Sequence, residues 1–306
     1  MRPKAPRFAT VLVVGLAVAT TVTSLAIAEP KSAPTRSQWT LAWSDNFNGP
    51  ANSSINTGDW KYDTGQGIFG NGEIQTMTSS ASNVHLDGRG DLDITALGSG
   101  NSWTSGRIQT ASSSFGAPAG GQMEVSATIK QPAPAQGLGY WPAFWLLGAG
   151  TWPEHGEIDI LEDVNALSDH SGALHCGNLT VLNSDSTTGP CHEFTGLSSG
   201  LQSCPGCQSG YQTYSVIVDR RNAAAQQIRW YLNGHEFFSV REKQVGTAPW
   251  TEAVDHGFSI ILDLAIGGTY PNTRCGCQTP TAQTTSGGTM TVRSLSVRYW
   301  KPGSAG

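Results

Sequence analysis

Polar and apolar residues alternate in short stretches along much of this sequence, and such period-two patterns predict β-strands that are buried on one face. The alternation is clearest over residues 91–96 and 122–130, and we expect further strands over 211–219, 258–265 and 289–299. No segment has the period of a long amphipathic helix. Many short strands with turn signals between them indicate an all-β sandwich or jelly roll.

One turn is specified by its own residues. Two strand-like runs, 227–232 and 235–240, flank the dipeptide Asn233-Gly234. Asn-Gly favours a two-residue type I′ turn, because both positions need positive φ angles. The sequence therefore predicts a β-hairpin at this point.

The start of the chain differs from the rest. A basic beginning, an apolar run over 11–19 and the triplet Ala26-Ile27-Ala28 have the order of a secretory signal peptide. We predict a signal peptide over 1–28, a flexible leader over 29–38 and a single domain over 39–306. An uncleaved membrane anchor is the alternative, although Thr and Ser dilute the second half of the apolar segment.

The composition excludes some partners and favours others. Charged residues make up 13% of the 306 residues, about half the usual share, and the formal net charge is −5. This balance argues against nucleic acid or an anionic membrane as partner. The 37 Gly and 10 Trp suit a neutral, hydroxylated ligand, because the apolar face of a sugar stacks on an aromatic ring. Trp that fills a large β core is the alternative, and we expect both uses.

The cysteines are Cys176, Cys191, Cys204, Cys207, Cys275 and Cys277. Their even number behind an export signal predicts disulfides. We favour Cys176–Cys191, which would clip a loop rich in small polar residues, and then Cys204–Cys207. The last two cysteines flank a single glycine, so we expect a direct bond between them to be strained. A zinc site built from the two closely spaced pairs is the alternative.

The segment with most chemical information is Glu157-Ile-Asp159-Ile-Leu-Glu162. In a regular strand Glu157 and Asp159 would share a face, whereas Glu162 would point into the core, where a carboxylate is costly. One extra residue, inserted as a β-bulge near 160–161, would return Glu162 to the face of the other two acids. We therefore predict a bulge here.

Three acids on one face repel each other, so their pKa values separate. Retaining glycosidases use such a separation, with one carboxylate as nucleophile and one carboxyl as acid. We assign Glu157 as nucleophile and Glu162 as general acid/base, with Asp159 between them to hydrogen-bond the nucleophile. A solvated acidic strand face or a calcium site is the alternative for this segment.

Aromatic residues crowd the segment before these acids, in Trp141-Pro-Ala-Phe-Trp145-Leu-Leu-Gly and then Trp152-Pro153. Together with the acid motif, this segment resembles glycoside hydrolase family 16 in its bulged E-x-D-x-x-E form, which is typical of laminarinase-like endo-β-1,3-glucanases. Weaker similarities to the family follow the same order along the chain, at residues 43–49, 70–75, 104–108, 174–175 and 264–268.

The resemblance implies a concanavalin-like β jelly-roll sandwich of two antiparallel sheets with a concave substrate cleft. It also implies retaining double displacement, and contacts of Asn71 and Arg107 with sugar hydroxyls near the cleavage point. A structural ion pair is the alternative for Arg107. Asp263 stands where the family usually has Asn.

The resemblance places further residues around the substrate. Trp141 and Trp145 would form part of the cleft, or one of them would lie in the core. Trp152 would lie beside the catalytic subsite, and His175 near the acid/base Glu162. A strand histidine with satisfied hydrogen bonds is the alternative for His175.

We therefore expect a secreted, monomeric endo-β-1,3-glucanase with a polysaccharide substrate, no membrane contact after signal cleavage and no cofactor. A structural calcium ion on the convex side is common in the family, but the sequence does not place its ligands. The cysteine-bearing loops, 176–210 and 270–288, depart from the family's common pattern. The sequence therefore does not determine which glycan is the substrate. The alternatives are an endo-β-galactanase, a transglycosylase or a non-catalytic glycan-binding protein.

Overall fold

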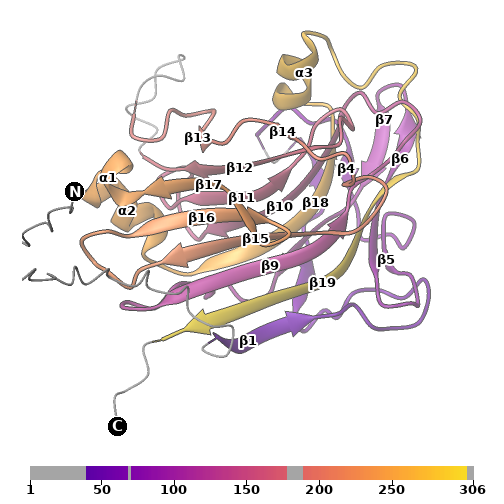
Figure 1. Ribbon diagram of the computed structural model, residues 1–306. Helices are drawn as coiled ribbons and strands as arrows, with labels where there is room; N and C mark the ends of the chain where they lie inside the picture. The colour runs from indigo at the N-terminus through magenta and orange to yellow at the C-terminus, as the bar shows by residue number, and fades with distance from the viewer. Residues whose placement is uncertain (1–38, 68–69, 178–188, 302–306) are drawn as a thin grey trace, which may run out of the picture. The chain divides into compact units, whose positions relative to one another are not determined.

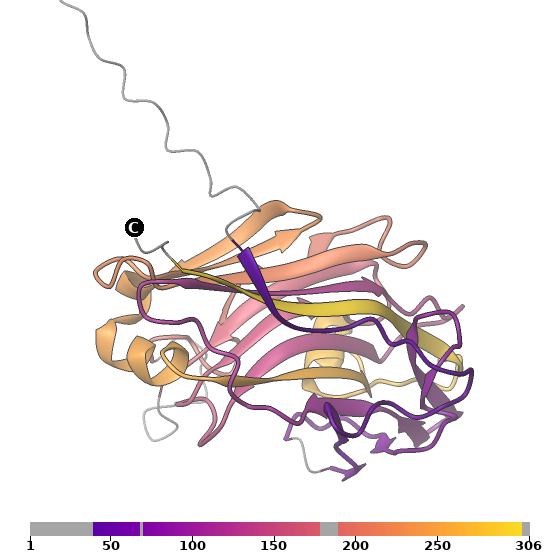
Figure 2. The ribbon, with the colours of Figure 1, turned by 90° about the horizontal axis from the view of Figure 1, so that it is seen from below.

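The computed structural model describes residues 39–67, 70–177 and 189–301 (Figure 1). The predicted signal peptide and leader, 1–38, lie outside the described residues. Within the described part, the domain is a sandwich of two β-sheets with three short helices. Figure 2 shows the layers of this sandwich from below. No helix within these ranges is long and apolar enough to cross a membrane.

The larger sheet has 11 strands in the described part of the chain. They are β1 (Trp39–Asp45), β3 (Gly65–Gln66), β4 (Thr76–Met77), β5 (Val84–Leu86), β6 (Leu92–Ser99), β7 (Ser102–Ser105), β9 (Gln122–Lys130), β15 (Gln212–Asp219), β16 (Gln227–Leu232), β17 (His235–Arg241) and β19 (Gly288–Trp300). Its main path runs β17-β16-β15-β9-β19-β6-β7-β4-β3, with β1 beside β19 and β5 beside β6.

The smaller sheet has eight strands among the described residues and contains the predicted acid strand. Its strands are β2 (Trp60–Tyr62), β8 (Arg107–Thr110), β10 (Tyr140–Gly148), β11 (Glu157–Glu162), β12 (Asp169–His175), β13 (Leu197–Ser198), β14 (Gln202–Ser203) and β18 (Phe258–Ile266). The path is β13-β12-β11-β10-β18-β8-β2, and β14 pairs with β12. The acid strand β11 therefore lies between the aromatic strand β10 and the histidine strand β12.

The β-sandwich and the individual strands confirm the sequence-based prediction. The strand expected over 122–130 is β9, with the same bounds, and the other expected strands are recovered to within a few residues. The hairpin is formed by β16 and β17, and Asn233 and Gly234 have φ angles of 51° and 79°. Positive φ at both turn residues is what a type I′ turn requires.

Two features depart from the expected all-antiparallel sandwich. Short helices occur at α1 (Glu242–Val245), α2 (Thr247–Val254) and α3 (Thr269–Cys275). In addition, β4 pairs with β7 in parallel, whereas the other pairs of named strands in the described residues are antiparallel. Neither feature changes the sheet that carries the acids.

Some tryptophan residues fill the core, as the composition suggested, whereas others are partly exposed on the sheet that carries the acids. Trp60, Trp230 and Trp250 are fully buried in the core, whereas Trp141 and Trp145 are only half-buried. The latter two lie on the same face of β10, because they are two positions apart in a strand. Neither Trp141 nor Trp145 is therefore in the core, and the alternative that one of them is buried there is wrong.

The structure pairs all six cysteines. Cys176–Cys191 and Cys204–Cys207 are bonded, as predicted. The third disulfide joins Cys275 directly to Cys277, the bond for which the sequence led us to expect strain. Gly276 adopts a left-handed conformation at the end of α3 (φ 63°, ψ 30°), and the two Cα atoms are 5.2 Å apart, within the ordinary range for a disulfide. No thiolate remains for the alternative zinc site.

Candidate active site

The predicted bulge is present in the acid strand. Trp145 on β10 pairs with Asp159, but the preceding residue Phe144 pairs with Leu161, so that Ile160 is skipped. The pairing of β11 with β12 shifts in the same place, between Asp159 and Glu162. The extra residue rotates Glu162 to the side of Asp159, and this confirms the geometric argument made from the sequence.

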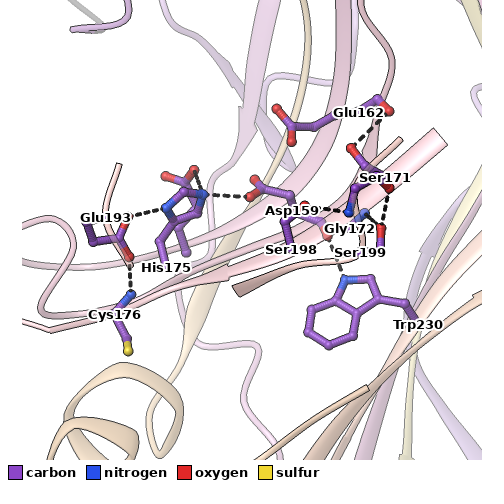
Figure 3. A network of polar contacts seen from close by, with 12 residues as sticks. Asp159, Glu162, Ser171, Gly172, His175, Cys176, Glu193, Ser198, Ser199 and Trp230 are labelled. Carbon is purple, nitrogen blue, oxygen red and sulfur yellow. Dashed lines mark hydrogen bonds and ion pairs between the residues drawn. The ribbon is translucent and has the colours of Figure 1, made fainter. Parts of the chain in front are cut away.

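The bulge is held from the opposite sheet. Trp230 on β16 donates its indole N–H to the backbone carbonyl of Asp159 at 2.6 Å (Figure 3). A bulge disrupts the ladder locally and leaves backbone groups without strand partners, and a buried carbonyl needs such a donor. The ring approaches Gly172 on β12 so closely that a Cβ there would lie 2.5 Å from Trp230 Cδ1.

The acids of β11 lie on one face, and the aliphatic residues between them are in the core. Glu157 and Glu162 are half-buried, and the side chain of Asp159 is 5% exposed. Ile158, Ile160 and Leu161 are buried. Each acid therefore loses much of its hydration without leaving the protein surface, which is the condition under which carboxyl pKa values rise.

His175, at the end of β12, joins two acids of this face to a third carboxylate (Figure 3). Its Nε2 forms an ion pair with Asp159 Oδ2 at 3.2 Å and lies 3.9 Å from Glu157 Oε1. Its Nδ1 contacts Glu193 Oε2 at 2.6 Å. The structure thus pairs Asp159 with His175, and the expected hydrogen bond from Asp159 to the nucleophile stays a prediction.

The position of His175 corrects the expectation that it lies next to Glu162. In the antiparallel register His175 pairs with Glu157, and Glu162 pairs with Ser171. Burial alone would lower the pKa of His175, but its contacts with Asp159 and Glu193, and the charge of Glu157, outweigh burial and raise that pKa well above its usual value. These surroundings therefore favour the charged form of the imidazole beside Glu157.

Burial is the main cause of the raised pKa values of Glu157 and Glu162. Burial and the charge of Asp159 raise the pKa of Glu157 well above its usual value, while the His175 cation opposes this rise. Burial and Asp159 also raise the pKa of Glu162, to about 8, against a hydrogen bond from Trp141. The cation beside Glu157 favours its ionised form, so Glu162 is the better candidate for the carboxyl that holds a proton.

Two aromatic residues surround Glu162. Trp141 on β10 donates its indole N–H to Glu162 Oε1 at 3.0 Å. Its ring meets that of Tyr270 in α3 edge to face, with centroids 5.7 Å apart. Burial and Glu162 raise the pKa of Tyr270 to about 12, so this phenol is neutral at ordinary pH.

A second polar cluster lies further along the same sheet. Trp145 donates its indole N–H to Asp263 Oδ1 at 2.7 Å, and the Arg107 guanidinium lies 4.8 Å from the Trp145 ring centroid. Arg107 also forms an ion pair with Asp63 at 3.0 Å, so the structural role considered for it from the sequence is present. Burial raises the pKa of Asp263 to about 6, although Arg107 and Trp145 oppose this rise.

An aromatic pair lies on the His175 side of the acids. The ring of Trp152 is 5.7 Å from that of His175 and is stacked on Phe194, with centroids 5.8 Å apart and planes 14° from parallel. Phe194 is 66% exposed, which is unusual for so large an apolar ring. Trp152 therefore contacts His175, and its place beside the catalytic subsite stays a prediction.

Asn71 is less directly connected to the acids. Its side chain is exposed, and its backbone carbonyl accepts a hydrogen bond from Thr269 N at 2.8 Å. Thr269 precedes Tyr270, whose ring contacts Trp141. A contact of Asn71 with substrate stays a prediction.

Among the described residues, Glu157, Asp159 and His175 offer ligand atoms within 4.8 Å of one another, a spacing that could hold a metal ion. His175 Nε2 faces Asp159 at 3.2 Å, however, and its Nδ1 contacts Glu193 at 2.6 Å. We therefore interpret these residues as a network of ion pairs.

Sequence reasoning did not find Glu193, Tyr270 or Phe194. Glu193 and Phe194 follow Cys191, which the disulfide to Cys176 ties to the end of β12, and Tyr270 follows the Gly267-Gly268 pair after β18. The one available signal was the cysteine pair, because a disulfide at the end of the histidine strand brings the following loop to the acids.

Comparison with known proteins agrees with this geometry. The sequence pattern described as XgeA-like, catalytic GH16 domain matches residues 124–225. The crystal structure of an endo-1,3-β-glucanase from Streptomyces sioyaensis superposes with a TM-score of 0.80 at 39% identity, over 89% of this chain and 100% of that one.

Curated relatives extend the comparison. Glucan endo-1,3-beta-glucosidase A1 of Niallia circulans is 30% identical over 272 residues, which is 79% of this chain, and this chain spans 35% of the length of that protein. A keratan-sulfate endo-1,4-beta-galactosidase of Sphingobacterium multivorum is 29% identical over 157 residues, 49% of this chain and 32% of its own length.

The sandwich, the bulged acid strand and these similarities define a glycoside hydrolase. The chain belongs to glycoside hydrolase family 16, and its similarity to endo-1,3-β-glucanases extends over nearly all of the described residues.

Proposed function

We propose that this protein is a secreted, retaining endo-glycosidase that hydrolyses internal β-1,3 linkages of a β-glucan. The observation that supports the proposal most strongly is the bulge in β11, which brings Glu157 and Glu162 to one face with a cation beside the first and an indole N–H on the second. Two carboxyl groups in unlike environments are what double displacement needs.

In the first step the ionised Glu157 attacks the anomeric carbon, and Glu162 donates its proton to the departing glycosidic oxygen. The glycosyl group is then bound covalently to Glu157, and Glu162 is ionised. In the second step Glu162 removes a proton from water, which attacks the same carbon and releases Glu157. Two inversions retain the β configuration. Asp159 and His175 lie beside the nucleophile in both steps.

The proposed substrate follows from the relatives whose described activity is on 1,3-β-glucan and from the aromatic residues beside the acids. Trp141, Trp145 and the Trp152–Phe194 pair offer faces on which pyranose rings can stack. The similarity to a keratan-sulfate endo-β-galactosidase favours a galactan as the second candidate. A transglycosylase would use the same residues and differ in its acceptor.

A panel of polysaccharides tests the proposal. Release of reducing ends would be measured on linear β-1,3-glucan, mixed-linkage β-1,3/1,4-glucan, β-1,3-galactan and agarose, and the first products would be examined by ¹H NMR. We expect short oligomers from β-1,3-glucan that carry the β anomer initially. An α anomer would contradict the retaining mechanism. Cleavage of a galactan without cleavage of β-1,3-glucan would mean that the substrate is a galactan.

Secretion rests on the first 28 residues and on the three disulfides, which form and persist in oxidising compartments. We propose that the chain is cleaved after Ala28. N-terminal sequencing of the protein from culture medium tests this, and a mature protein that still begins at Met1 would contradict it.

A further inference from the structure

Glu193 is a buried carboxylate outside the strands that carry the acids, and the mechanism above does not use it. Its side chain is 1% exposed. One oxygen, Oε1, accepts the backbone N–H of Cys176 at 2.8 Å, and the other, Oε2, meets His175 Nδ1 at 2.6 Å. A carboxylate so deeply buried requires compensating charge, and His175 supplies it.

The Cys176–Cys191 disulfide holds the segment that carries Glu193 against the end of β12. Cys176 follows His175 directly, and its disulfide partner Cys191 lies two residues before Glu193. The strand end and the loop are thus tied by one disulfide and by two contacts of a single carboxylate. This arrangement holds the imidazole ring so that Nε2 faces Asp159 and Glu157.

We propose that Glu193 is a positioning residue that keeps His175 an imidazolium and directs its charge at Asp159 and Glu157. The proposal deepens the proposed function, on which its kinetic part rests. Among the described residues, the titratable groups that face His175 are Asp159 and Glu157 from β11 and Glu193 from the loop. The positive end of the His175–Glu193 pair is the end nearer to the nucleophile.

The substitution Glu193→Gln tests this with little change of shape. The Gln carbonyl can still accept the N–H of Cys176, so its NH₂ must face His175 Nδ1 and donate to it. That contact favours the neutral ring with its proton on Nε2. The variant therefore removes the imidazolium charge and retains the contact with Asp159.

The kinetic readout is the acidic limb of the pH profile of kcat/KM on β-1,3-glucan. Without the cation the pKa of Glu157 rises, so we expect the limb to move up by about one pH unit. On the acid side kcat/KM then falls about tenfold, while at the optimum it changes less than about threefold. Glu193→Asp, which retains the charge, should restore part of the shift.

A readout without substrate separates this proposal from the proposed function. In ¹⁵N-histidine NMR, with the His175 signal assigned by its absence in His175→Gln, we expect an imidazolium at pH 7 in the wild type and a neutral ring in Glu193→Gln. The matched control is Glu252→Gln, which breaks the His155–Glu252 ion pair of 3.2 Å outside the acid face and should move neither readout.

Two results would overturn the proposal. One is a charged His175 in both proteins, or a neutral His175 in both. The other is a uniform loss of kcat/KM in Glu193→Gln with an unmoved acidic limb, which is what a merely structural role would give. Inactivity of the wild type on every glycan would refute the proposed function, and the NMR result would still decide the role of Glu193.

Discussion

The indole N–H of Trp141 donates to Glu162 Oε1 at 3.0 Å, and the same ring meets Tyr270 edge to face. One side chain therefore contributes to the aromatic surface and also influences the pKa of the candidate acid/base. A hydrogen bond to a carboxylate stabilises its ionised form, so Trp141 opposes the burial that raises the pKa of Glu162.

Trp141→Phe should separate these two roles, because it keeps a ring and removes the donor. Without the hydrogen bond the pKa of Glu162 rises above about 8, so Glu162 holds its proton to higher pH. We expect the alkaline limb of kcat/KM to move up by at most about one pH unit. The pH profile measures this, with Trp145→Phe as control because that indole donates to Asp263 instead. A limb that moves down would contradict the assignment of Glu162.

Glu157→Gln should abolish turnover and leave the fold intact, because it removes the nucleophile and keeps the shape. We expect kcat to fall by at least about 10⁴-fold. The melting temperature at pH 7 should be equal to that of the wild type or higher, since burial raises the pKa of Glu157 and makes its ionised form costly. Reducing-sugar release and thermal unfolding check both points. Normal sugar release would remove Glu157 from the mechanism.

Glu162→Ala should lose activity on polysaccharide but regain part of it with azide. An activated aryl glycoside needs little acid assistance in the first step, and azide, a good anionic nucleophile, can replace base-activated water in the second. The expected product is a β-glycosyl azide, detected by mass spectrometry. If the covalent intermediate forms and azide still gives no acceleration, Glu162 is not the acid/base.

Asp263→Asn should change the pH dependence of stability. Burial raises the pKa of Asp263 from 3.8 to about 6, so the folded chain binds more protons than the unfolded chain between these values. The free energy of unfolding therefore falls as the pH rises from about 4 to about 6. Asn cannot ionise but can still accept the N–H of Trp145.

We expect this variant to be more stable than the wild type above about pH 6, by an upper bound of roughly 3 kcal/mol. The gain should vanish near pH 4, where Asp263 is protonated. Urea unfolding at both pH values measures it. An equal difference at both values would mean that the charge of Asp263 is not the cause.

Trp230→Phe should weaken the bulge from the core side. The substitution leaves the buried carbonyl of Asp159 without its donor and removes part of a fully buried ring. We expect a loss of roughly 2–4 kcal/mol in the free energy of unfolding. Activity per folded molecule should also fall, because Glu157 and Glu162 lose their relative position.

Trp250→Phe is the matched control for that variant. Trp250 is equally buried, but its indole donates to the side chain of Gln226. A similar loss of stability with normal activity is expected there. If both variants lost activity equally, the hydrogen bond to the bulge would have no specific role.

Local pattern predicted the strands and the bulge because each is determined by neighbouring residues. The bounds of β9 followed from strict alternation, and the turn at Asn233-Gly234 from the φ angles it requires. The bulge followed from the cost of turning Glu162 into the core. Such arguments use only a few consecutive residues, so the sequence alone sufficed.

Glu193 and the Cys275–Cys277 bond could not be predicted in this way. Glu193 reaches His175 across a separation of 18 residues, through a loop whose path the periodicity does not specify. The short disulfide depends on the left-handed turn of Gly276 at the end of α3, a helix too short to show a pattern. Contacts that depend on the path of a loop can be identified only in the folded structure.

The bulge in β11 contains one extra residue, Ile160, which a single codon encodes. Deleting that codon would leave Glu, Asp and Glu at alternate positions of a regular strand, where all three side chains share a face without any bulge. The regular, unbulged spacing of three acids therefore lies a single in-frame deletion away. The deletion would remove the bulge whose carbonyl Trp230 holds, so the core would have to accommodate a regular strand at this point.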